Sequence, residues 1–366
     1  MPAREDRLVE VGRENDGAHG AESRSLGIAL LSPIQEVVPP DGYGGVESVV
    51  ADLADALVEA GHDVTLFARK GSDTKAKLVA TTDELPEQPG RRLEAELEHA
   101  VESFLRADEF DVVSSHLGVT AAALRPPTAP VVHTVSDPMD RARPLWEKLA
   151  RLSPGLQLIA VSDRQRELAP GLPWAATIPN PVDAGRYRFE ERPDGYLAFL
   201  GRMSPDKGAD HAIEVARRAG LQLKIGAKLR DPHEEEYFDE AVRPHLDDGV
   251  EYLGELDHDG KVELLGGALA ILVPAQIEEA FGLVLVESMA CGTPVIAFGD
   301  GAIPEVVVDG RTGFVVDDEA QMLGALERVE GIDRAACRRY VEEVFAPSRI
   351  VAAYERCFGS LVRGAG

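Results

Sequence analysis

Two charged residues in the second half of the chain have the types and spacing of an anion-binding site. Arg202 and Lys207 lie in the stretch GRMSPDKG (201–208), which follows an apolar run and predicts a helix that opens near Pro205. Cations beside a helix N-terminus bind phosphate, because their charge adds to that of the unpaired backbone amides. A solvated surface turn is the competing interpretation. In so acidic a chain, a close Arg/Lys pair after a strand favours an anionic ligand, because ligands collect at this edge of α/β sheets.

Two glutamates follow in the stretch EEAFGLVLVE (278–287). Glu279 and Glu287 are eight residues apart, so they lie near one face if a single helix contains both. We expect Glu279 to precede the helix and Glu287 to sit among apolar side chains. A carboxylate in such surroundings needs a hydrogen-bonding partner, and sugar hydroxyls are suitable ones. A helix cap followed by an ordinary polar helix position is the alternative interpretation.

The elements that position these residues alternate between short apolar runs and amphipathic stretches. This alternation predicts parallel sheets with crossover helices, so the fold class is α/β with two Rossmann-like domains facing across a cleft. The expected strands of the first half are 26–31, 64–68, 111–115, 130–135 and 157–161, with a helix over 45–60. Those of the second half are 196–201, 221–226, 250–253, 270–273, 294–298 and 314–316.

The length of 366 residues suits two domains of about 150 to 200 residues each. A stretch dense in Pro, Gly and charge at 179–194 is expected to link them. The predicted divisions are an acidic, disordered leader (1–25), an N-terminal acceptor domain (26–184), a C-terminal donor domain (185–345) and a C-terminal segment (346–366). The last helix, near 348–361, can cross back to the first domain.

Composition excludes several classes of function. A net charge of −26 would repel phosphate backbones, so nucleic acid is not an expected partner. No apolar run approaches the roughly 18 residues that span a bilayer, and the polar N-terminus has no secretory h-region. A cytoplasmic location follows as an expectation. Cys291, Cys337 and Cys357 are far apart, so neither a zinc site nor a disulfide framework is expected, and Cys291 in its apolar stretch indicates a buried residue.

The motifs together resemble those of glycosyltransferase family 4. Glu279-x7-Glu287, with Gly282 between and ACGTPVIA (290–297) after, resembles the family's donor-site signature. The loop 201–208 resembles its diphosphate-binding loop, and 301–307 and 309–314 resemble its C-terminal pattern. In the first half, GYGGVE (42–47) and GHDVT (61–65) resemble its glycine-rich loop and second-strand entry. The resemblance covers residues 26 to 330 and is more specific in the donor half.

This resemblance implies the GT-B fold and a retaining transfer of sugar from a nucleoside diphosphate sugar to an acceptor hydroxyl. The favoured donor is a uridine diphosphate sugar, with guanosine diphosphate mannose next. It also implies front-face attack, in which the leaving phosphate accepts the acceptor's proton. No metal and no cofactor are expected, because protein cations supply the positive charge. The donor half offers no Asp-x-Asp motif suited to bridging a metal and a nucleotide.

The resemblance also implies roles for individual residues. Arg202 and Lys207 would bind the pyrophosphate, with help from the backbone amides of Gly282 and Leu283. Glu279 would hold the transferred sugar and Glu287 the ribose. Residues expected in or beside the first domain's part of the site are Gly44 and Gly45, which would let its backbone approach the phosphates, together with His133, His116 and Asn180.

The last three residues have alternative interpretations. His133 ends the strand segment Val131-Val132-His133 and matches the family's histidine beside the anomeric centre, although a strand-end histidine with a satisfied ring fits as well. His116 ends the run 112–116 and is a second candidate at the edge of the cleft. Asn180 matches an asparagine near the family's hinge or is a simple turn residue. Acceptor contacts are expected from the loops 32–43 and 137–146.

Three other functions compete with sugar transfer. A nicotinamide oxidoreductase should carry Gly-x-Gly-x-x-Gly directly after its first strand, whereas Leu31 is followed here by Ser-Pro-Ile-Gln. A sugar-nucleotide 2-epimerase of the same two-domain shape stays open, and its product would distinguish it. A non-catalytic nucleotide-sugar-binding protein is the third class. The four intact charged residues of the donor half argue against it.

Overall fold

The computed structural model describes residues 24–86, 88–124, 128–247 and 249–364. The chain divides into two compact units: unit 1 comprises Met1–Pro181 and Pro347–Gly366, and unit 2 comprises Val182–Ala346. The first division falls three residues before the predicted boundary at 184. The predicted leader lies outside the described residues, except for positions 24 and 25. That the two units face one another across a cleft stays a prediction.

Unit 1 is built on a parallel sheet, as predicted. In its described residues the sheet has seven strands in the order β3-β2-β1-β4-β5-β6-β7, and every recorded pairing is parallel. The strands are β1 (Gly27–Leu31), β2 (Asp63–Arg69), β3 (Lys77–Thr82), β4 (Val112–Ser115), β5 (Val131–Val135), β6 (Leu158–Ala160) and β7 (Trp174–Thr177). The two edge strands, β3 and β7, were not predicted. Their residues are largely exposed or half-buried, so they lack the apolar run that marks a buried strand.

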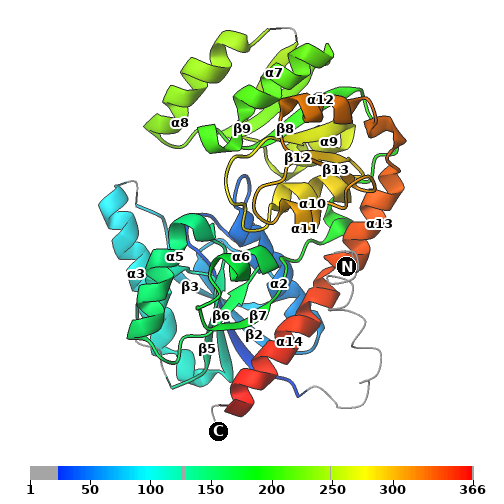
Figure 1. Cartoon of the computed structure of the whole chain (residues 1–366). Coiled ribbons are helices and arrows are strands. Elements are labelled where there is room, and N and C mark those ends of the chain that lie inside the picture. The colour runs from blue at the N-terminus through cyan, green and yellow to red at the C-terminus, as the bar shows by residue number, and fades with distance from the viewer. Residues whose placement is uncertain (1–23, 87, 125–127, 248, 365–366) are drawn as a thin grey trace. The chain divides into compact units, whose positions relative to one another are not determined.

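Helices cover both faces of this sheet (Figure 1). Alternate residues of a strand point to opposite faces, so Ile28 and Leu30 pack in one core cluster with α2 and α14, whereas Ala29 and Leu31 pack in another beside α3. The helices of unit 1 are α2 (Gly45–Glu59), α3 (Pro89–Leu105), α4 (Val119–Ala122), α5 (Met139–Leu152), α6 (Asp163–Leu168) and α14 (Pro347–Gly364).

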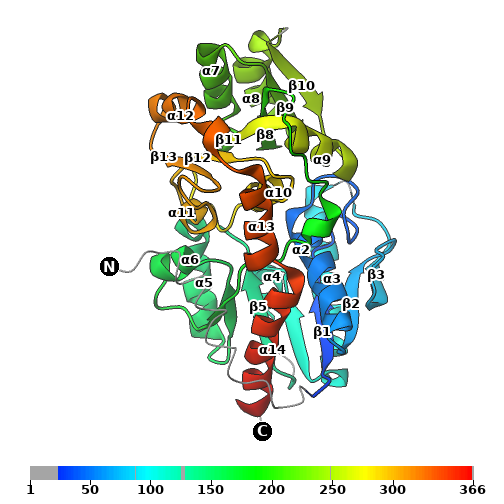
Figure 2. The same ribbon diagram turned by 90° about the vertical axis from the view of Figure 1, so that its right-hand side faces the viewer.

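The C-terminal helix α14 belongs to unit 1. Its Tyr354 and Phe358 are fully buried in the core cluster that also contains Ile28 and Leu53. Figure 2 shows α14 running beside α2 along the sheet. Burying each such aromatic side chain stabilises the fold by about 1.5 to 3 kcal/mol. The chain therefore leaves unit 1 at Pro181 and returns to it at Pro347.

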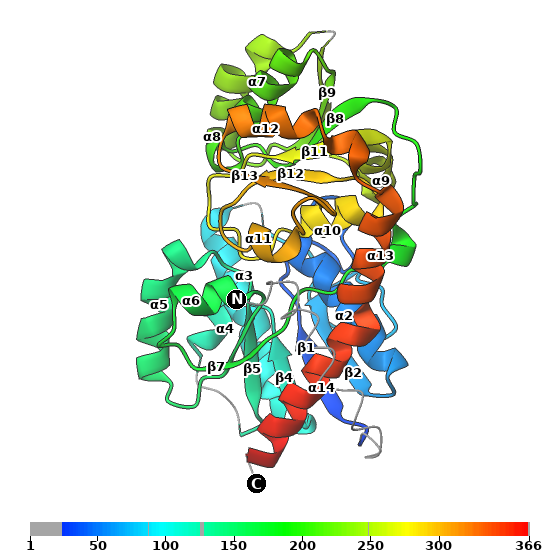
Figure 3. The ribbon, with the colours of Figure 1, turned by 45° about the vertical axis from the view of Figure 1, so that its right-hand side comes forward.

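Unit 2 repeats the same plan. In the described residues its six-stranded parallel sheet has the order β10-β9-β8-β11-β12-β13. The strands are β8 (Tyr196–Arg202), β9 (Leu223–Lys228), β10 (Val250–Gly254), β11 (Ala268–Val273), β12 (Val295–Phe298) and β13 (Gly313–Val316). The helices are α7 (Ala209–Ala219), α8 (Pro232–Tyr237), α9 (His258–Gly267), α10 (Leu283–Ala290), α11 (Ile303–Val306), α12 (Glu319–Leu326) and α13 (Arg334–Val344). Figure 3 shows α7 and α12 on one side of the sheet and α10 and α11 on the other.

Each sheet has one point where the strand order reverses. In unit 1 it lies between β1 and β4, and in unit 2 between β8 and β11. Ligands of open α/β sheets bind outside the carboxyl ends of the strands at this switch point. The loops that follow these four strands are therefore expected to form the ligand-binding sites.

The structure also bears on two of the exclusions drawn from composition. All three cysteines are buried and unpaired. Burial raises the pKa of the Cys291 and Cys337 thiols to about 12, so neither forms the thiolate that a nucleophile needs. In the part of the chain that the structure describes, no helix combines the length and the apolar character required to cross a membrane.

Candidate active site

The loop after β8 places both predicted cations at the switch point of unit 2. Arg202 is the last residue of β8, and Lys207 ends a short 3-10 turn, Pro205–Lys207. The turn does begin at Pro205, as predicted, but the regular helix α7 begins only at Ala209, because Gly208 takes a left-handed conformation (φ +74°). A Cβ at Gly208 would lie 2.5 Å from the Pro274 carbonyl oxygen, so glycine lets this loop touch the loop after β11.

Asp206 stabilises the conformation of the loop after β8. Its Oδ1 accepts a hydrogen bond from Ser204 Oγ at 2.5 Å, and its backbone oxygen accepts one from the Gln276 amide at 2.9 Å. The other carboxylate oxygen lies 3.6 Å from Arg202 Nη2. The Arg202 side chain is still 42% exposed. A guanidinium that is oriented by a carboxylate and open to solvent can bind an incoming anion.

Lys207 and Glu279 meet, although 72 residues separate them in the sequence. Their side chains form a hydrogen-bonded ion pair and are only 19% and 16% exposed. The contact joins the loop after β8 to the loop after β11, the two loops that the switch point predicts. Lys207 and Glu279, which belong to separate sequence motifs, are therefore in direct contact in the structure.

The backbone around Glu279 is fixed by the loop after β12. The Ala302 amide donates to the Glu279 carbonyl oxygen at 2.8 Å. A Cβ at Gly301 would lie 2.2 Å from the Glu279 nitrogen, a distance that no other residue type allows. Glu279 precedes α10, as predicted, so the two glutamates do not share one helix. Gly282 is the N-cap of α10 and Leu283 its first residue, which puts their amides at the helix N-terminus.

Glu287, in the interior of α10, has protein partners that the sequence did not predict. The Tyr187 hydroxyl donates to its Oε1 at 2.9 Å, and Lys261 Nζ on α9 lies 2.5 Å from the same oxygen. The glutamate and the lysine are mostly buried. The carboxylate is thus paired inside unit 2 before any ribose binds. Tyr187 and Lys261 lie 100 and 26 residues away, so no local spacing marks them.

One Asp-x-Asp sequence does occur in the donor half, at Asp257 and Asp259. Its first member has a structural role, because Asp257 is the N-cap of α9 and its Oδ1 accepts a hydrogen bond from the Gly260 amide at 2.8 Å. This bond satisfies one of the unpaired amides of the first helical turn.

Three predicted residues of unit 1 lie at a helix start or after the last strand of the sheet. Gly44 is the N-cap of α2 and Gly45 its first residue, so the glycine-rich loop ends in a helix N-terminus. Asn180 is buried shortly after β7, next to the last residue of the first part of unit 1. The approach of Gly44 and Gly45 to a donor phosphate and a hinge role for Asn180 stay predictions.

The strand expected over 130–135 is present as β5, so the narrower expectation that His133 ends the strand was wrong. The strand β5 continues to Val135, so His133 is the third of its five residues. The side chain is buried, its Nδ1 has no partner among the described residues, and burial lowers its pKa to about 4. His133 is not among the described residues that line the nearby pocket of unit 1. The residues beyond it, Ser136 and Asp137, do line that pocket.

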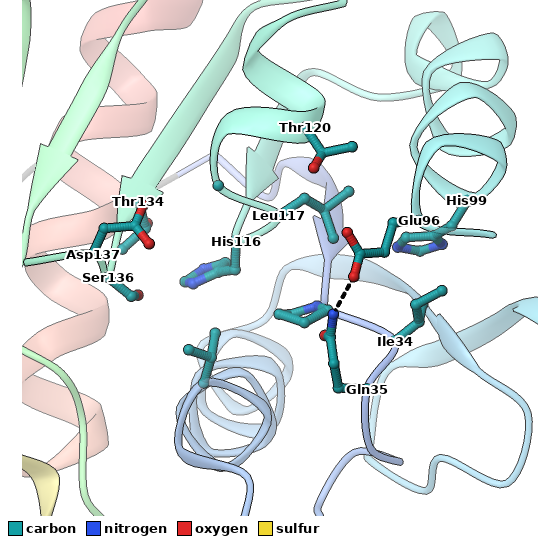
Figure 4. Close-up of a pocket in the computed structure, with 13 residues that line it drawn as sticks. Ile34, Gln35, Glu96, His99, His116, Leu117, Thr120, Thr134, Ser136 and Asp137 are labelled. Atoms are coloured by element: carbon teal, nitrogen blue, oxygen red, sulfur yellow. Dashed lines mark hydrogen bonds between the residues drawn. The ribbon is translucent and has the colours of Figure 1, made fainter. Parts of the chain in front are cut away.

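The pocket of unit 1 lies at that unit's own switch point and contains His116 (Figure 4). It has a volume of about 200 Å³. The pocket is lined by residues 33–35 after β1, by residues 116–118 after β4 and by Asp137. The two loops predicted to contact the acceptor, 32–43 and 137–146, therefore both contribute to it. The lining residues that the sequence did not predict include Glu96 and His99 on α3 and Thr120 on α4.

Hydrogen bonds order one side of this pocket. Gln35 Nε2 donates to Glu96 Oε1 at 2.5 Å, the contact dashed in Figure 4. His99 lies 2.5 Å from the Thr81 hydroxyl and 2.9 Å from the Ser32 carbonyl oxygen. His116 differs from His99, because neither of its ring nitrogens has a partner among the described residues. Burial raises the pKa of the Asp137 carboxyl above its ordinary value.

Comparison with known proteins identifies the family of this chain. Residues 187–339 match the model described as Glycosyl transferases group 1, and residues 43–186 match the model described as Glycosyltransferase Family 4. The chain is 29% identical to a glycogen synthase of Mycobacterium tuberculosis over 82% of this chain and 86% of the relative. It is also 29% identical to a phosphatidyl-myo-inositol mannosyltransferase of Mycolicibacterium smegmatis, over 92% and 95%.

A solved structure agrees with both comparisons. AviGT4, a glycosyltransferase involved in avilamycin A biosynthesis, is 27% identical and superposes with a TM-score of 0.71, covering 93% of this chain and 98% of its own. The two family models meet at residues 186 and 187, five residues beyond the point where the structure divides. With two parallel α/β units and these matches, the chain belongs to the family 4 glycosyltransferases of the GT-B type.

Proposed function

We propose that the protein transfers a sugar from a nucleoside diphosphate sugar to an acceptor hydroxyl, with retention of configuration and without a divalent metal. The observation that carries the proposal is the meeting of Lys207 with Glu279 beside Arg202, at the switch point of unit 2. A cation pair for phosphates and a carboxylate for sugar hydroxyls are both needed to hold such a donor.

The cations explain why the reaction needs no metal. The protein carries a net charge of −26, so an anionic nucleotide must find local positive charge. Arg202 and Lys207 supply it on one loop, and the N-terminus of α10 adds backbone amides at Gly282 and Leu283. As the bond to the leaving phosphate breaks, negative charge grows on the nucleoside diphosphate. Fixed cations and amides stabilise that charge as a metal ion would.

The two carboxylates take different parts of the donor. Glu279 comes from a loop and pairs with Lys207, so it is placed to hold the hydroxyls of the transferred sugar next to the diphosphate. Glu287 is oriented by Tyr187 and Lys261 and would accept hydrogen bonds from the ribose. Lys261 offsets part of the cost of keeping this carboxylate buried while no nucleotide is bound.

The proposed chemistry is a front-face displacement. The bond between the anomeric carbon and the β-phosphate oxygen breaks while a bond from the acceptor oxygen forms on the same face of the sugar. The acceptor's proton passes to the departing phosphate, so the products are the glycoside and the nucleoside diphosphate. A double displacement would need a carboxylate behind the anomeric carbon, and the sequence nominates none.

The donor base and sugar are proposed from the family resemblance. A uridine diphosphate sugar is the first donor to test and guanosine diphosphate mannose the second, since the name of the mycolicibacterial relative specifies mannose transfer. The relatives' names divide on the acceptor: one implies a glucan, which is uncharged, and the other a phosphatidylinositol, which carries a phosphate. The relatives' names therefore do not indicate whether the acceptor of this chain carries a phosphate.

Product analysis tests the proposal. The full chain is incubated with each nucleotide sugar and a panel of hydroxylated acceptors, with a chelator present. We expect release of nucleoside diphosphate, a new glycoside, and by NMR the same anomeric configuration as in the donor. An epimerised sugar free in solution would instead establish the 2-epimerase alternative. Activity that the chelator abolishes and magnesium or manganese restores would overturn metal independence.

A further inference from the structure

The pocket of unit 1 is acidic. Its lining includes two carboxylic side chains, Glu96 on α3 and Asp137 after β5. No lysine or arginine occurs among the described residues that line it. Arg69 approaches from outside the lining and donates through Nη1 to the Gln35 carbonyl oxygen at 3.4 Å. A phosphate placed in this pocket would therefore meet like charge, which costs binding energy.

The two histidines that line the pocket add no positive charge to it at neutral pH. Burial lowers the pKa of His99 to about 4. Burial, followed by the neighbouring His133, lowers the pKa of His116 to about 4 as well. Both rings are consequently uncharged at pH 7. An anion finds no charged imidazolium here to pair with.

His116 points to the kind of ligand that the pocket takes. Only 4% of this residue is exposed, both ring nitrogens lack a partner among the described residues, and the ring lies between the Gln35–Glu96 and Ser136–Asp137 sides of the pocket in Figure 4. A neutral imidazole donates through one nitrogen and accepts through the other. Hydroxyl groups satisfy both nitrogens because they donate and accept, whereas an ionised phosphate oxygen only accepts.

We propose that this pocket binds the acceptor, and that the part of the acceptor entering it is a single uncharged, polyhydroxylated ring without a phosphate. The inference rests on the proposed function, since it names the second substrate of the same reaction. Hydroxyls of the ring bond to His116, Asp137 and Glu96. The pocket has a volume of about 200 Å³, so a six-membered ring has room to enter it.

Matched pairs of probes test the proposal. We compare glucose with glucose 6-phosphate, and myo-inositol with its 1-phosphate, by saturation-transfer NMR on the full chain and by transfer from the donor. The uncharged member of each pair should bind, and should be preferred about tenfold or more, because like-charge contacts cost several kcal/mol. Equal or better use of the phosphorylated members, or failure of both uncharged members to bind, would overturn the proposal.

Two variants assign the effect to the pocket. His116→Leu removes the unpaired ring nitrogens and should weaken binding of the uncharged probes about tenfold, since a buried polar partner is lost. Thr120→Lys adds a cation to the wall and should shift the preference toward the phosphorylated probe. Thr128→Lys makes the same change at an exposed position outside the lining and serves as the control. Unchanged preference in Thr120→Lys would contradict the charge argument.

The readouts separate the two proposals from each other. Nucleoside diphosphate affinity and slow hydrolysis of the donor depend on unit 2 and report on the proposed function. Probe binding to the chain without donor reports on the pocket. Loss of the first with the second intact would overturn the transferase, whereas a normal donor half combined with a preference for phosphorylated probes would overturn the acceptor class.

Discussion

The two switch points of this molecule have the same topology and opposite chemistry. In unit 2 the loops after β8 and β11 carry Arg202, Lys207 and Glu279. In unit 1 the loops after β1 and β4 line a pocket together with α3 and the segment after β5, and the lining contains carboxylic groups and neutral histidines. The fold fixes where a ligand binds in each sheet, while the side chains around that place decide whether the ligand carries phosphate or hydroxyl groups.

The comparison also extends to how charge is balanced before a ligand arrives. In unit 2 each proposed donor residue that is charged has a charged neighbour: Lys207 has Glu279, Arg202 has Asp206, and Glu287 has Lys261. In unit 1 the buried histidine rings stay neutral, and His116 has unpaired nitrogens. Unit 2 is thus prepared for an ion and unit 1 for a neutral, hydrogen-bonding molecule.

The largest expected effect comes from Glu279, because the comparison assigns it to the reacting sugar. Glu279→Gln should lower kcat about 10- to 100-fold, since hydrogen bonds to a charged group contribute about 1.5 to 3 kcal/mol, and those to the sugar tighten in the transition state. Free nucleoside diphosphate should bind at least as well, because Lys207 loses its carboxylate partner. Steady-state kinetics and calorimetry measure the two effects.

A control with the same chemical change is available in unit 2. Glu251 is an exposed residue of β10, and Glu251→Gln should leave both kcat and nucleotide affinity unchanged. If Glu279→Gln instead weakened the nucleoside diphosphate while kcat stayed near that of the wild type, the orientation of the donor proposed here would be reversed.

A smaller effect is expected at Glu287, which the account places at the ribose. Glu287→Gln should raise the KM for the donor and the Kd for the nucleoside diphosphate together, by about tenfold, with little change in kcat. Tyr187→Phe should act in the same direction but more weakly, because it removes one hydrogen bond that orients the carboxylate. A fall in kcat without a change in nucleotide affinity would place Glu287 at the sugar.

The smallest expected effect tests whether a buried histidine of unit 1 is neutral in the folded protein. The folded pKa of His133 is about 4, below the ordinary value of 6.5. The unfolded chain therefore binds a proton first as pH falls, so the stability contributed by the neutral ring is present above about pH 6.5 and is lost toward pH 4. In His133→Leu, the melting temperature of unit 1 should fall less steeply between pH 7 and 4.5. Parallel calorimetric curves for variant and wild type would mean that His133 is not neutral in the fold.

The sequence predicted the donor loops well because their chemistry is local. Arg202 and Lys207 lie close together at the end of an apolar strand and in the short loop after it. Glu279 lies just before Gly282 and the apolar helix that begins at Leu283. The edge strands β3 and β7 escaped prediction because, with little burial, their residues show no apolar run. Lys261 and Tyr187 escaped because only tertiary packing brings them to Glu287.

Unit 1 shows the limit of reading strand ends from sequence. The strand expected over 130–135 ends at Val135, as observed, but the separate expectation that the polar His133 ends a strand was wrong, because His133 and Thr134 are both buried inside β5. Thr134, Ser136 and Asp137, which follow His133 in the chain, line the pocket, whereas His133 is not among its described lining residues. Glu96, His99 and Thr120 reach the same pocket from helices whose sequences contain no binding motif.

The most direct test of the account measures nucleoside diphosphate binding to unit 2's cations. Isothermal titration calorimetry, with chelator present, compares the wild type with Arg202→Ala, Lys207→Ala and the double variant. We predict metal-free binding by the wild type and a loss of about 10- to 100-fold for each single change, the equivalent of about 1.5 to 3 kcal/mol per charge-assisted contact. Affinity that is unchanged in all three variants, or that requires a divalent metal, would contradict it.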